Sequence, residues 1–259
     1  MRARKCSYRT MPMAMPWAMP WDFWIIFAML GVLIPWRGRA RLQRLLAQDS
    51  IDSREKLILY GGTIAFQWLL AALVAWRAFA RGLTLGELGA VHPVTAQLLA
   101  WTVGGAGILG VLHWFNLRRL ASLGDALPRL PRQLAEKVLP RTSLEFTVYC
   151  AVSVTAGVCE EFLYRGFAMA VLRRMGLAAG LVVLLSAVLF GLAHLYQGKS
   201  GVGGTAVLGL LFGAGRLWTG SLIPVMVWHT VIDVVAGKAG PRFLAPGAVQ
   251  ELAVRHDLS

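Results

Sequence analysis

The chain has 259 residues, of which 57% are hydrophobic and 15% are charged. Soluble domains are usually about 45–50% apolar and about 25% charged, so both fractions are typical of a membrane protein. The composition excludes a disordered chain, because the apolar residues exceed what such a chain contains. Three cysteines, few and odd in number, also exclude a small disulfide-stapled scaffold.

The charge balance, 26 Lys and Arg against 13 Asp and Glu, would also suit a nucleic-acid-binding protein. The positions of the charges argue against nucleic acid, because every lysine and arginine lies outside seven apolar stretches. These stretches are 17–36, 57–76, 95–115, 144–164, 177–196, 202–215 and 221–237. Basic loops of this kind hold a helical bundle at anionic lipid headgroups. We therefore expect an all-α, polytopic transmembrane bundle of about seven to eight membrane helices, with membrane lipid as a partner.

The first stretch, 17–36, starts and ends with tryptophan and is followed by a basic linker, 37–56. Tryptophan is enriched at membrane interfaces, and no clear cleavage site ends the stretch, so we expect a retained helix rather than a signal peptide. The next stretch, 57–76, carries no charge and is expected to cross the membrane. After it, Thr84 and Glu87 have the spacing of a capping box, which predicts a short helical turn.

The second half of the chain begins with the longest linker, 116–143, whose basic, proline-interrupted pattern predicts an amphipathic surface helix with breaks. The excess of basic residues in 37–56 and 116–143 favours a cytoplasmic location for both linkers. The short stretch 202–215 is expected to tilt little, to stop partway or to extend through Arg216. We divide the chain into N-terminal membrane helices with basic linkers (1–143), core helices (144–237) and a C-terminal tail (238–259).

Five acidic residues lie inside the apolar stretches. Asp22 and Glu145 lie near the starts of their stretches and are expected at the membrane interface. Glu160, Glu161 and Asp233 lie deeper, where a carboxylate costs about 2.5–3.5 kcal/mol even on a lenient insertion scale. Residues kept at that cost usually line a water-filled cavity, so these three indicate a functional site.

The adjacent glutamates have different surroundings on a helix. Glu161 and Arg165 are four residues apart, so they share a face and can pair, whereas Glu160 points about 100° away and is left free. One carboxylate would then be held as an anion while the other exchanges a proton. The alternative is that both glutamates mark the end of their helix at the membrane interface and merely pair with Arg165.

Two histidines lie inside the later stretches. His194 follows Phe190 by four residues, and a single histidine of this kind is more often a packing residue than a catalyst. His229 and Asp233 are also four apart and share one helix face. The patterns HExxH and GxSxG are absent, which excludes a zincin-type helix and a serine nucleophile elbow. We expect polar groups from three stretches to meet inside one bundle.

These residues form three motifs in a familiar order. They are EExxxR at Glu160–Arg165, FxxxH at Phe190–His194 and HxxxN or HxxxD at His229–Asp233. In order and spacing they resemble the CPBP family of intramembrane endopeptidases, the CAAX proteases and bacteriocin-processing enzymes also called the ABI family. The resemblance covers about 144–237, whereas the first 143 residues are similar to the family only in being helical membrane sequence.

The resemblance implies a helical protease that hydrolyses a peptide bond of a membrane-associated peptide or protein, CAAX-like or other, within the bilayer. In this family Glu160 would be the general base that activates water, assisted by His194. Glu161 with Arg165 would structure the site. A carboxylate in a low-dielectric cavity beside another suits a general base at neutral pH.

The third motif departs from the prenyl-protein-processing enzymes, because Asp233 stands where they have asparagine. The family roles of His229 and Asp233 are to stabilise the oxyanion or position water. An ionised aspartate cannot donate a hydrogen bond, so Asp233 would orient His229 as the donor. Glu160, His194 and His229 could also bind Zn²⁺, so a glutamate-activated water without a cofactor and a metal-activated water both stay open.

Two other classes of function are compatible with the same residues. A proton-coupled transporter could use the buried acids and histidines as a relay, although no inverted repeat is present. A non-enzymatic immunity or scaffold protein could retain the fold, although the intact motifs speak against this. Composition and family favour a multi-pass protein of a prokaryotic inner membrane.

Overall fold

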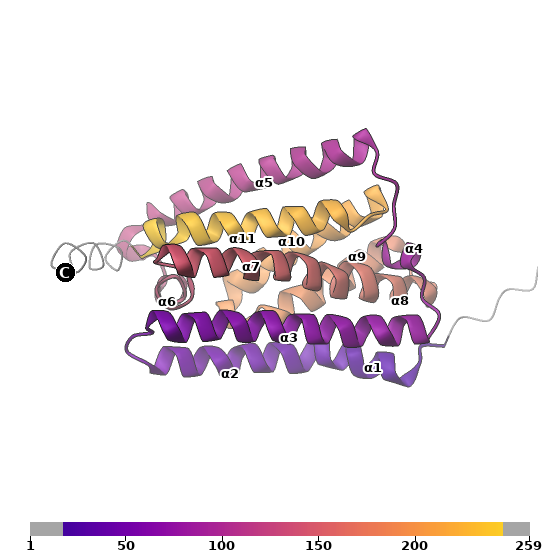
Figure 1. Cartoon of the computed structure of the whole chain (residues 1–259), viewed down its shortest axis with the longest axis horizontal. Coiled ribbons are helices and arrows are strands. Elements are labelled where there is room, and N and C mark those ends of the chain that lie inside the picture. The colour runs from indigo at the N-terminus through magenta and orange to yellow at the C-terminus, as the bar shows by residue number, and fades with distance from the viewer. Residues whose placement is uncertain (1–17, 246–259) are drawn as a thin grey trace, which may run out of the picture.

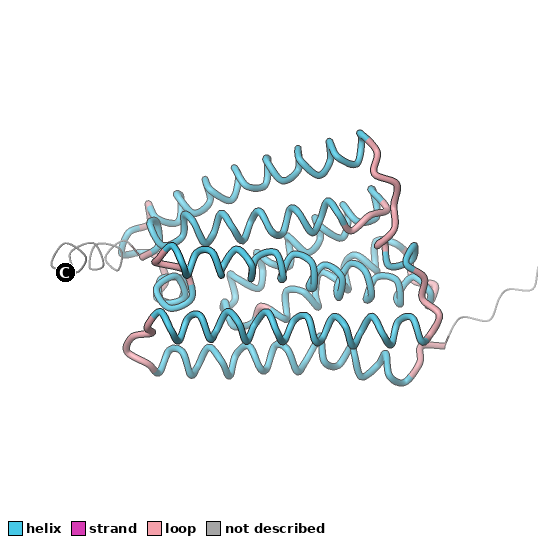
Figure 2. Tube along the Cα trace, viewed as in Figure 1, coloured by secondary structure: helices cyan, strands magenta, loops and turns pink. Residues whose placement is uncertain are grey.

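The structure is a computed structural model that describes residues 18–245, and this part of the chain contains helices and loops without β-strands (Figure 2). Five helical stretches are long and apolar enough to cross a membrane: Trp21–Ala47, Ser53–Ala80, Ala96–Ala121, Ser143–Arg174 and Leu195–Thr219. The predicted all-α membrane bundle is thus confirmed. The other two apolar stretches form α9 (Ala179–Ala193), which is shorter, and α11 (Ile223–Leu244). Trp17, the expected start of the first stretch, lies outside the described residues.

The first rod combines three elements: α1 (Trp21–Ala28), the π-helix η1 (Met29–Leu33) and α2 (Ile34–Ala47). Pro35 lacks a backbone N–H, and the π-turn just before it accommodates the missing bond without ending the helix. The interpretation of 37–56 as a linker is wrong, because only 48–52 separates α2 from α3 (Ser53–Ala80). The Arg, Leu, Gln and Ala residues of this segment favour helix, and Asp52 caps α3.

The connections contain the short helices expected from their patterns. Thr84 and Glu87 form the predicted capping box at the start of α4 (Leu85–Leu88). After α5 (Ala96–Ala121) and the 3-10 turn η2 (Gly124–Ala126), the amphipathic surface helix predicted in 116–143 is α6 (Arg129–Val138). The tail expected from residue 238 onward begins inside α11, which continues to Leu244.

The longest rod carries the paired glutamates. It joins α7 (Ser143–Glu161), the π-helix η3 (Phe162–Ala168) and α8 (Met169–Arg174) into one membrane-length stretch. Glu160 follows the first residue of the rod by 17 positions and precedes its last by 14, so it lies near the middle. The alternative that the glutamates mark a helix end at the interface is therefore wrong.

The helices pack around this rod in a bundle (Figure 1). Helix α7 packs against α3 on one side and α11 on another, and α11 in turn packs against α5. The hairpin of α9 and α10 (Gly198–Thr219) lies behind these helices, linked by the 3-10 turn η4 (Leu195–Gln197). Helix α10 extends through Arg216, which was one of the three alternatives expected for 202–215. The α2–α3 turn and α6 lie at one end of the bundle and α4 at the other.

Helices α7 and α11 approach each other closely at a small residue. A side chain at Gly157 would collide with Thr230 and with the backbone carbonyl of Met226. Thr230 also donates a hydrogen bond to the carbonyl oxygen of Ser153, at 3.4 Å. Small residues allow membrane helices to bring their backbones together. This contact lies one turn before Glu161 and brings α11 within reach of it.

Candidate active site

The Glu161–Arg165 pair spans the junction between α7 and the π-turn η3. Both side chains are fully buried, and Arg165 Nη1 donates to Glu161 Oε1 at 2.8 Å. The guanidinium also lies over the rings of Phe190 and Phe212, at 4.2 and 5.4 Å from their centroids. A buried charge requires a partner and favourable packing, and Arg165 has both. The pairing predicted from the i, i+4 spacing is confirmed.

The same carboxylate oxygen holds a histidine from α11. His229 Nδ1 lies 2.8 Å from Glu161 Oε1, and since a carboxylate accepts, the ring nitrogen is the donor. The ring lies 5.8 Å from each of Phe190 and Phe212, centroid to centroid. Its Nε2 lies 3.7 Å from Asp233 Oδ2, longer than a hydrogen bond. His229 is thus oriented by the hydrogen bond that it donates to Glu161, whereas Asp233 faces the other nitrogen.

Glu160 is held by a residue that the motifs do not contain. Gln67, on α3, donates from Nε2 to Glu160 Oε1 at 2.6 Å. The second oxygen, Oε2, is buried and has no hydrogen-bond partner among the described residues. Sequence reasoning treated 57–76 only as an uncharged membrane stretch and missed Gln67. An amide in the middle of such a stretch was the available signal, because polar groups in membrane helices usually have a partner.

His194 lies at the end of a helix that is too short to cross the bilayer. Helix α9 has 15 residues, about 22 Å. Glu160 precedes Arg174 by 14 residues, about 21 Å along the neighbouring rod, which ends at the end of the bundle where α9 begins. His194 Nδ1 lies 2.8 Å from the carbonyl oxygen of Phe190, so Nδ1 carries a proton and Nε2 of the neutral ring is the acceptor.

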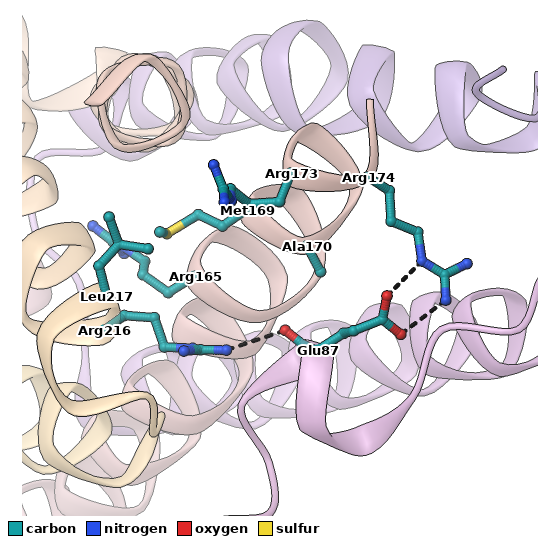
Figure 3. Close-up of a pocket in the computed structure, with 8 residues that line it drawn as sticks. All are labelled: Glu87, Arg165, Met169, Ala170, Arg173, Arg174, Arg216 and Leu217. Atoms are coloured by element: carbon teal, nitrogen blue, oxygen red, sulfur yellow. Dashed lines mark hydrogen bonds and ion pairs between the residues drawn. The ribbon is translucent and has the colours of Figure 1, made fainter. Parts of the chain in front are cut away.

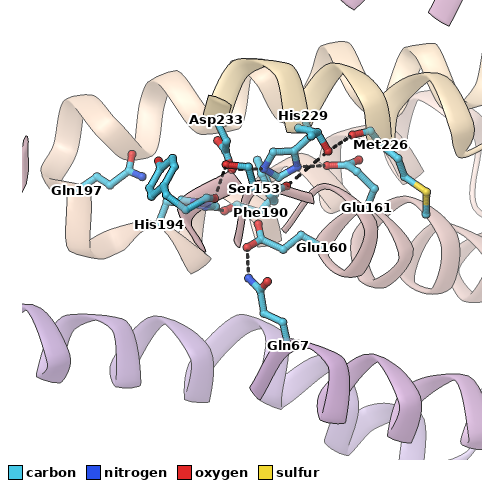
Figure 4. A network of polar contacts seen from close by, with 12 residues as sticks. Gln67, Ser153, Glu160, Glu161, Phe190, His194, Gln197, Met226, His229 and Asp233 are labelled. Carbon is cyan, nitrogen blue, oxygen red and sulfur yellow. Dashed lines mark hydrogen bonds and ion pairs between the residues drawn. The ribbon is translucent and has the colours of Figure 1, made fainter. Parts of the chain in front are cut away.

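These side chains turn toward one another from three elements (Figure 4). Glu160 comes from α7, His194 from the end of α9, and His229 and Asp233 from α11. Polar groups from the three predicted stretches therefore meet inside the bundle. Their catalytic roles stay predictions.

The metal candidates do not form a ligand set. Among residues 18–245, no three His, Cys, Asp or Glu side chains form a group that could hold a metal ion. The candidate His229 uses Nδ1 to contact Glu161, and Glu160 uses one oxygen to contact Gln67.

A cavity of about 590 Å³ lies beside the residues that follow His194. Leu195 and Tyr196 line it together with α2 and the start of α10, and the Tyr196 ring lies 5.8 Å from that of His194. The lining is mainly apolar, with Arg39 and Lys199 among its residues. The cavity offers room for an apolar chain beside Leu195 and Tyr196.

Residues 142–235 match the family model described as type II CAAX prenyl endopeptidase Rce1-like. The match contains all three motifs and confirms the resemblance to the CPBP family over this part of the chain. It agrees with the apolar helices in describing an integral membrane protein similar to a protease family. Comparisons with curated proteins and with solved structures found no match. Gln67 lies outside the matched residues.

Proposed function

We propose that this protein is an intramembrane endopeptidase that uses a glutamate-activated water to cleave a peptide bond of a membrane-associated substrate. One observation carries the proposal. Glu160 lies near the middle of a membrane-length helix, with one oxygen fixed by Gln67 and the other without a hydrogen-bond partner among residues 18–245 (Figure 4). A carboxylate that is positioned but not neutralised suits a general base.

In the proposed reaction, Glu160 Oε2 takes a proton from water while the water oxygen bonds to the carbonyl carbon. The water donates its second proton in a hydrogen bond to Nε2 of His194. This ring is held in place because its Nδ1 donates to the Phe190 carbonyl oxygen. Glu160 then returns the proton to the leaving nitrogen as the carbon–nitrogen bond breaks. Both groups act in a low-dielectric interior, where such contacts are stronger than in water.

The oxyanion would be stabilised from α11. Glu161 occupies His229 Nδ1, so Nε2 is the nitrogen that can donate to a substrate oxygen when it carries a proton. Asp233, 3.7 Å from that nitrogen, favours the proton there by its charge. Arg165 pairs with Glu161 and holds it in place, which makes Arg165 a positioning residue.

The cavity beside the residues that follow His194 supports a substrate with both apolar and anionic parts. An apolar lining with Arg39 and Lys199 suits a peptide that carries an apolar group and an anionic end. A prenylated CAAX-like tail has both features, and another membrane-associated peptide could share them. The substrate would reach His194 from this side, because Leu195 and Tyr196 belong to the cavity wall.

We further place the protein in a prokaryotic inner membrane, with the α6 end of the bundle in the cytoplasm. Basic residues at the end of α2, at the start of α3, in α6 and in the last turns of α11 gather at this end (Figure 1). Positively charged connections stay on the cytoplasmic side. The cavity beside His194 borders α6 through Leu130, so this orientation gives substrate entry from the cytoplasm.

The decisive experiment is cleavage of a farnesylated CAAX peptide and its unprenylated counterpart by purified protein in lipid nanodiscs. Glu160→Gln keeps an acceptor for Gln67 but cannot take a proton, so we expect the rate to fall on the order of 10³-fold. Glu136→Gln, on the surface helix α6, is the matched control and should cleave like the native protein.

Near-native cleavage by Glu160→Gln would overturn the proposal. A chelator added to the native enzyme tests the alternative mechanism, because loss of activity that Zn²⁺ restores would replace glutamate-activated water by metal-activated water. Proton uptake into liposomes that depends on Glu160, without cleavage of either peptide, would favour a transporter instead.

A further inference from the structure

A second cavity, of about 280 Å³, lies near the α4 end of the bundle (Figure 3). Its walls come from α4, the η3–α8 part of the long rod and the last turns of α10. Four arginines line it, with a single acid, Glu87: they are Arg165, Arg173, Arg174 and Arg216. The remaining lining is apolar. The cavity therefore combines a strong positive charge with a hydrophobic wall.

Two of the four arginines are neutralised by carboxylates. Arg165 pairs with Glu161 at the deep end, as described for the active site. Arg174 forms a two-point contact with Glu87, with Nε and Nη2 lying 2.6 and 2.8 Å from the carboxylate oxygens. These pairs account for the only acid of the lining and leave two positive charges.

The other two arginines contact only backbone carbonyls by hydrogen bond in the described residues. Arg173 donates to the carbonyl oxygen of Leu177 at 3.0 Å, and Arg216 Nη2 donates to that of Glu87 at 3.1 Å. No ion pair to either is present within residues 18–245. In addition, Arg216 Nε is buried without a hydrogen-bond partner. The cavity thus retains unneutralised charge beside a buried donor.

The fold makes room for this unneutralised arginine. A side chain at Gly89 would overlap the guanidinium of Arg216, so only glycine allows the contact. Gly89 has φ 71°, the left-handed conformation that ends α4, and its carbonyl accepts from Leu222 N at 2.9 Å.

The depth of the cavity matches the lipid headgroups. Arg173 and Arg174 are the last two residues of their membrane-length stretch, and Arg216 lies three residues before the end of another. Arginine contacts phosphate oxygens through several N–H groups of its planar fork. We propose that this cavity binds a phosphate group, held by Arg173 and Arg216. Arg165 lines this cavity and also pairs with Glu161 in the active site, but the phosphate proposal rests on Arg173 and Arg216 and not on the protease activity.

The phosphate could belong to an anionic phospholipid or be free in solution, and the test distinguishes these sources. Thermal unfolding of the Glu160→Gln protein is followed in neutral detergent micelles during titration with phosphatidylglycerol, phosphatidylcholine or inorganic phosphate. Binding to the folded state raises the unfolding temperature as ligand is added. Using this variant separates binding from catalysis, so the result does not depend on the protease proposal.

We expect phosphatidylglycerol or inorganic phosphate to raise the unfolding temperature at concentrations where phosphatidylcholine has little effect. Arg216→Gln and Arg173→Gln should each weaken the apparent affinity about 10-fold, the usual effect of losing one charge-assisted hydrogen bond. Arg119→Gln, an exposed arginine near the opposite end of the bundle, is the matched control and should bind like the parent.

Each outcome decides the proposal. A response to phosphatidylglycerol alone assigns a lipid headgroup, and an equal response to inorganic phosphate assigns a free anion. No response to either, or equal weakening by Arg119→Gln and Arg173→Gln, would overturn the site. Arg173 is exposed, so its variant folds even if Arg216→Gln disturbs the contact with Gly89.

Discussion

The long rod from Ser143 to Arg174 and helix α5 are both apolar, yet they occupy opposite environments. In the most apolar window of each, 39% of the residues are buried in the rod and 11% in α5. The rod contacts α3 and α11, whereas α5 packs mainly on α11 at the edge of the bundle. Polar chemistry can be kept in the rod because protein rather than lipid surrounds it. Hydropathy alone does not distinguish these two kinds of helix.

Helix α3 lies between these extremes and belongs to the region outside the family match. In its most apolar window 22% of the residues are buried, on the side that faces α7. On that side, Gln67 donates a hydrogen bond to Glu160. The next residue, Trp68, donates from Nε1 to the hydroxyl oxygen of Thr155 at 3.2 Å. The N-terminal helices therefore contribute one polar contact to the site rather than only a hydrophobic wall.

The largest expected effect comes from breaking the buried ion pair of the rod. Arg165→Met leaves Glu161 as a buried charge without its arginine, and we expect a loss of about 3 kcal/mol in unfolding free energy. Denaturant-induced unfolding in micelles measures it. Glu161→Gln combined with Arg165→Met should recover part of the stability, because no isolated charge then remains.

The matched control is Arg81→Met near the membrane edge. Arg81 lies 3.2 Å from Asp22, is 34% exposed in its side chain and shares that acid with Arg77. We expect a loss below about 1 kcal/mol, because Arg81 is partly exposed and Asp22 keeps its contact with Arg77. Equal losses at Arg165 and Arg81 would contradict the distinction between the buried rod and the outer helices.

A second comparison uses two glycines in different environments. Gly157→Ala must push α7 away from Thr230, so we expect a loss of about 2 kcal/mol in stability and weaker cleavage. Gly61→Ala on α3 meets no atom within 4 Å and should stabilise its helix slightly. Thermal unfolding of both variants tests this, and a similar response at the two sites would argue against the close approach.

The contribution of α3 to the site is tested by two adjacent residues. Gln67→Ala removes the donor to Glu160, and we expect kcat to fall about 10-fold with KM unchanged, since the base loses its orientation. Trp68→Phe removes the neighbouring hydrogen bond to Thr155 and should leave kcat near native. If the two variants differ in unfolding temperature, the loss of activity comes from altered packing. If they have equal kcat values, Gln67 has no part in the mechanism.

The smallest expected effect concerns Glu87 in the loop helix α4. Hydrogen bonds from Arg174 lower the pKa of Glu87 from 4.5 to about 2. A carboxyl group with a lowered pKa stabilises the folded state above its unfolded value and loses that contribution as the pH falls toward about 2. The group is partly exposed, so we expect less than about 1 kcal/mol.

Unfolding of the native protein and Glu87→Gln between pH 6 and 2 measures this contribution. Glutamine preserves the capping box, so the two proteins should differ near pH 6 and converge at low pH. A difference that stays constant over this range would show that the contact with Arg174 is not electrostatic.

Much of the fold was predictable because membrane helices must satisfy their own backbone groups. The apolar stretches, the capping box at Thr84 and the surface helix α6 all follow from local patterns. The basic segment 37–56 was misread, since arginine is as typical of a helix as of a linker. The pair of Glu161 and Arg165 was predictable from spacing within one helix.

The sequence by itself determined which polar residues are costly enough to indicate a site, because a carboxylate or imidazole in an apolar stretch is conspicuous wherever the helix lies. Only the tertiary structure decided how they are held. Gln67 reaches Glu160, and His229 reaches Glu161, through contacts between helices far apart in the chain. Such contacts depend on which helix faces meet, and in lipid small residues such as Gly157 set that packing, whereas hydropathy does not.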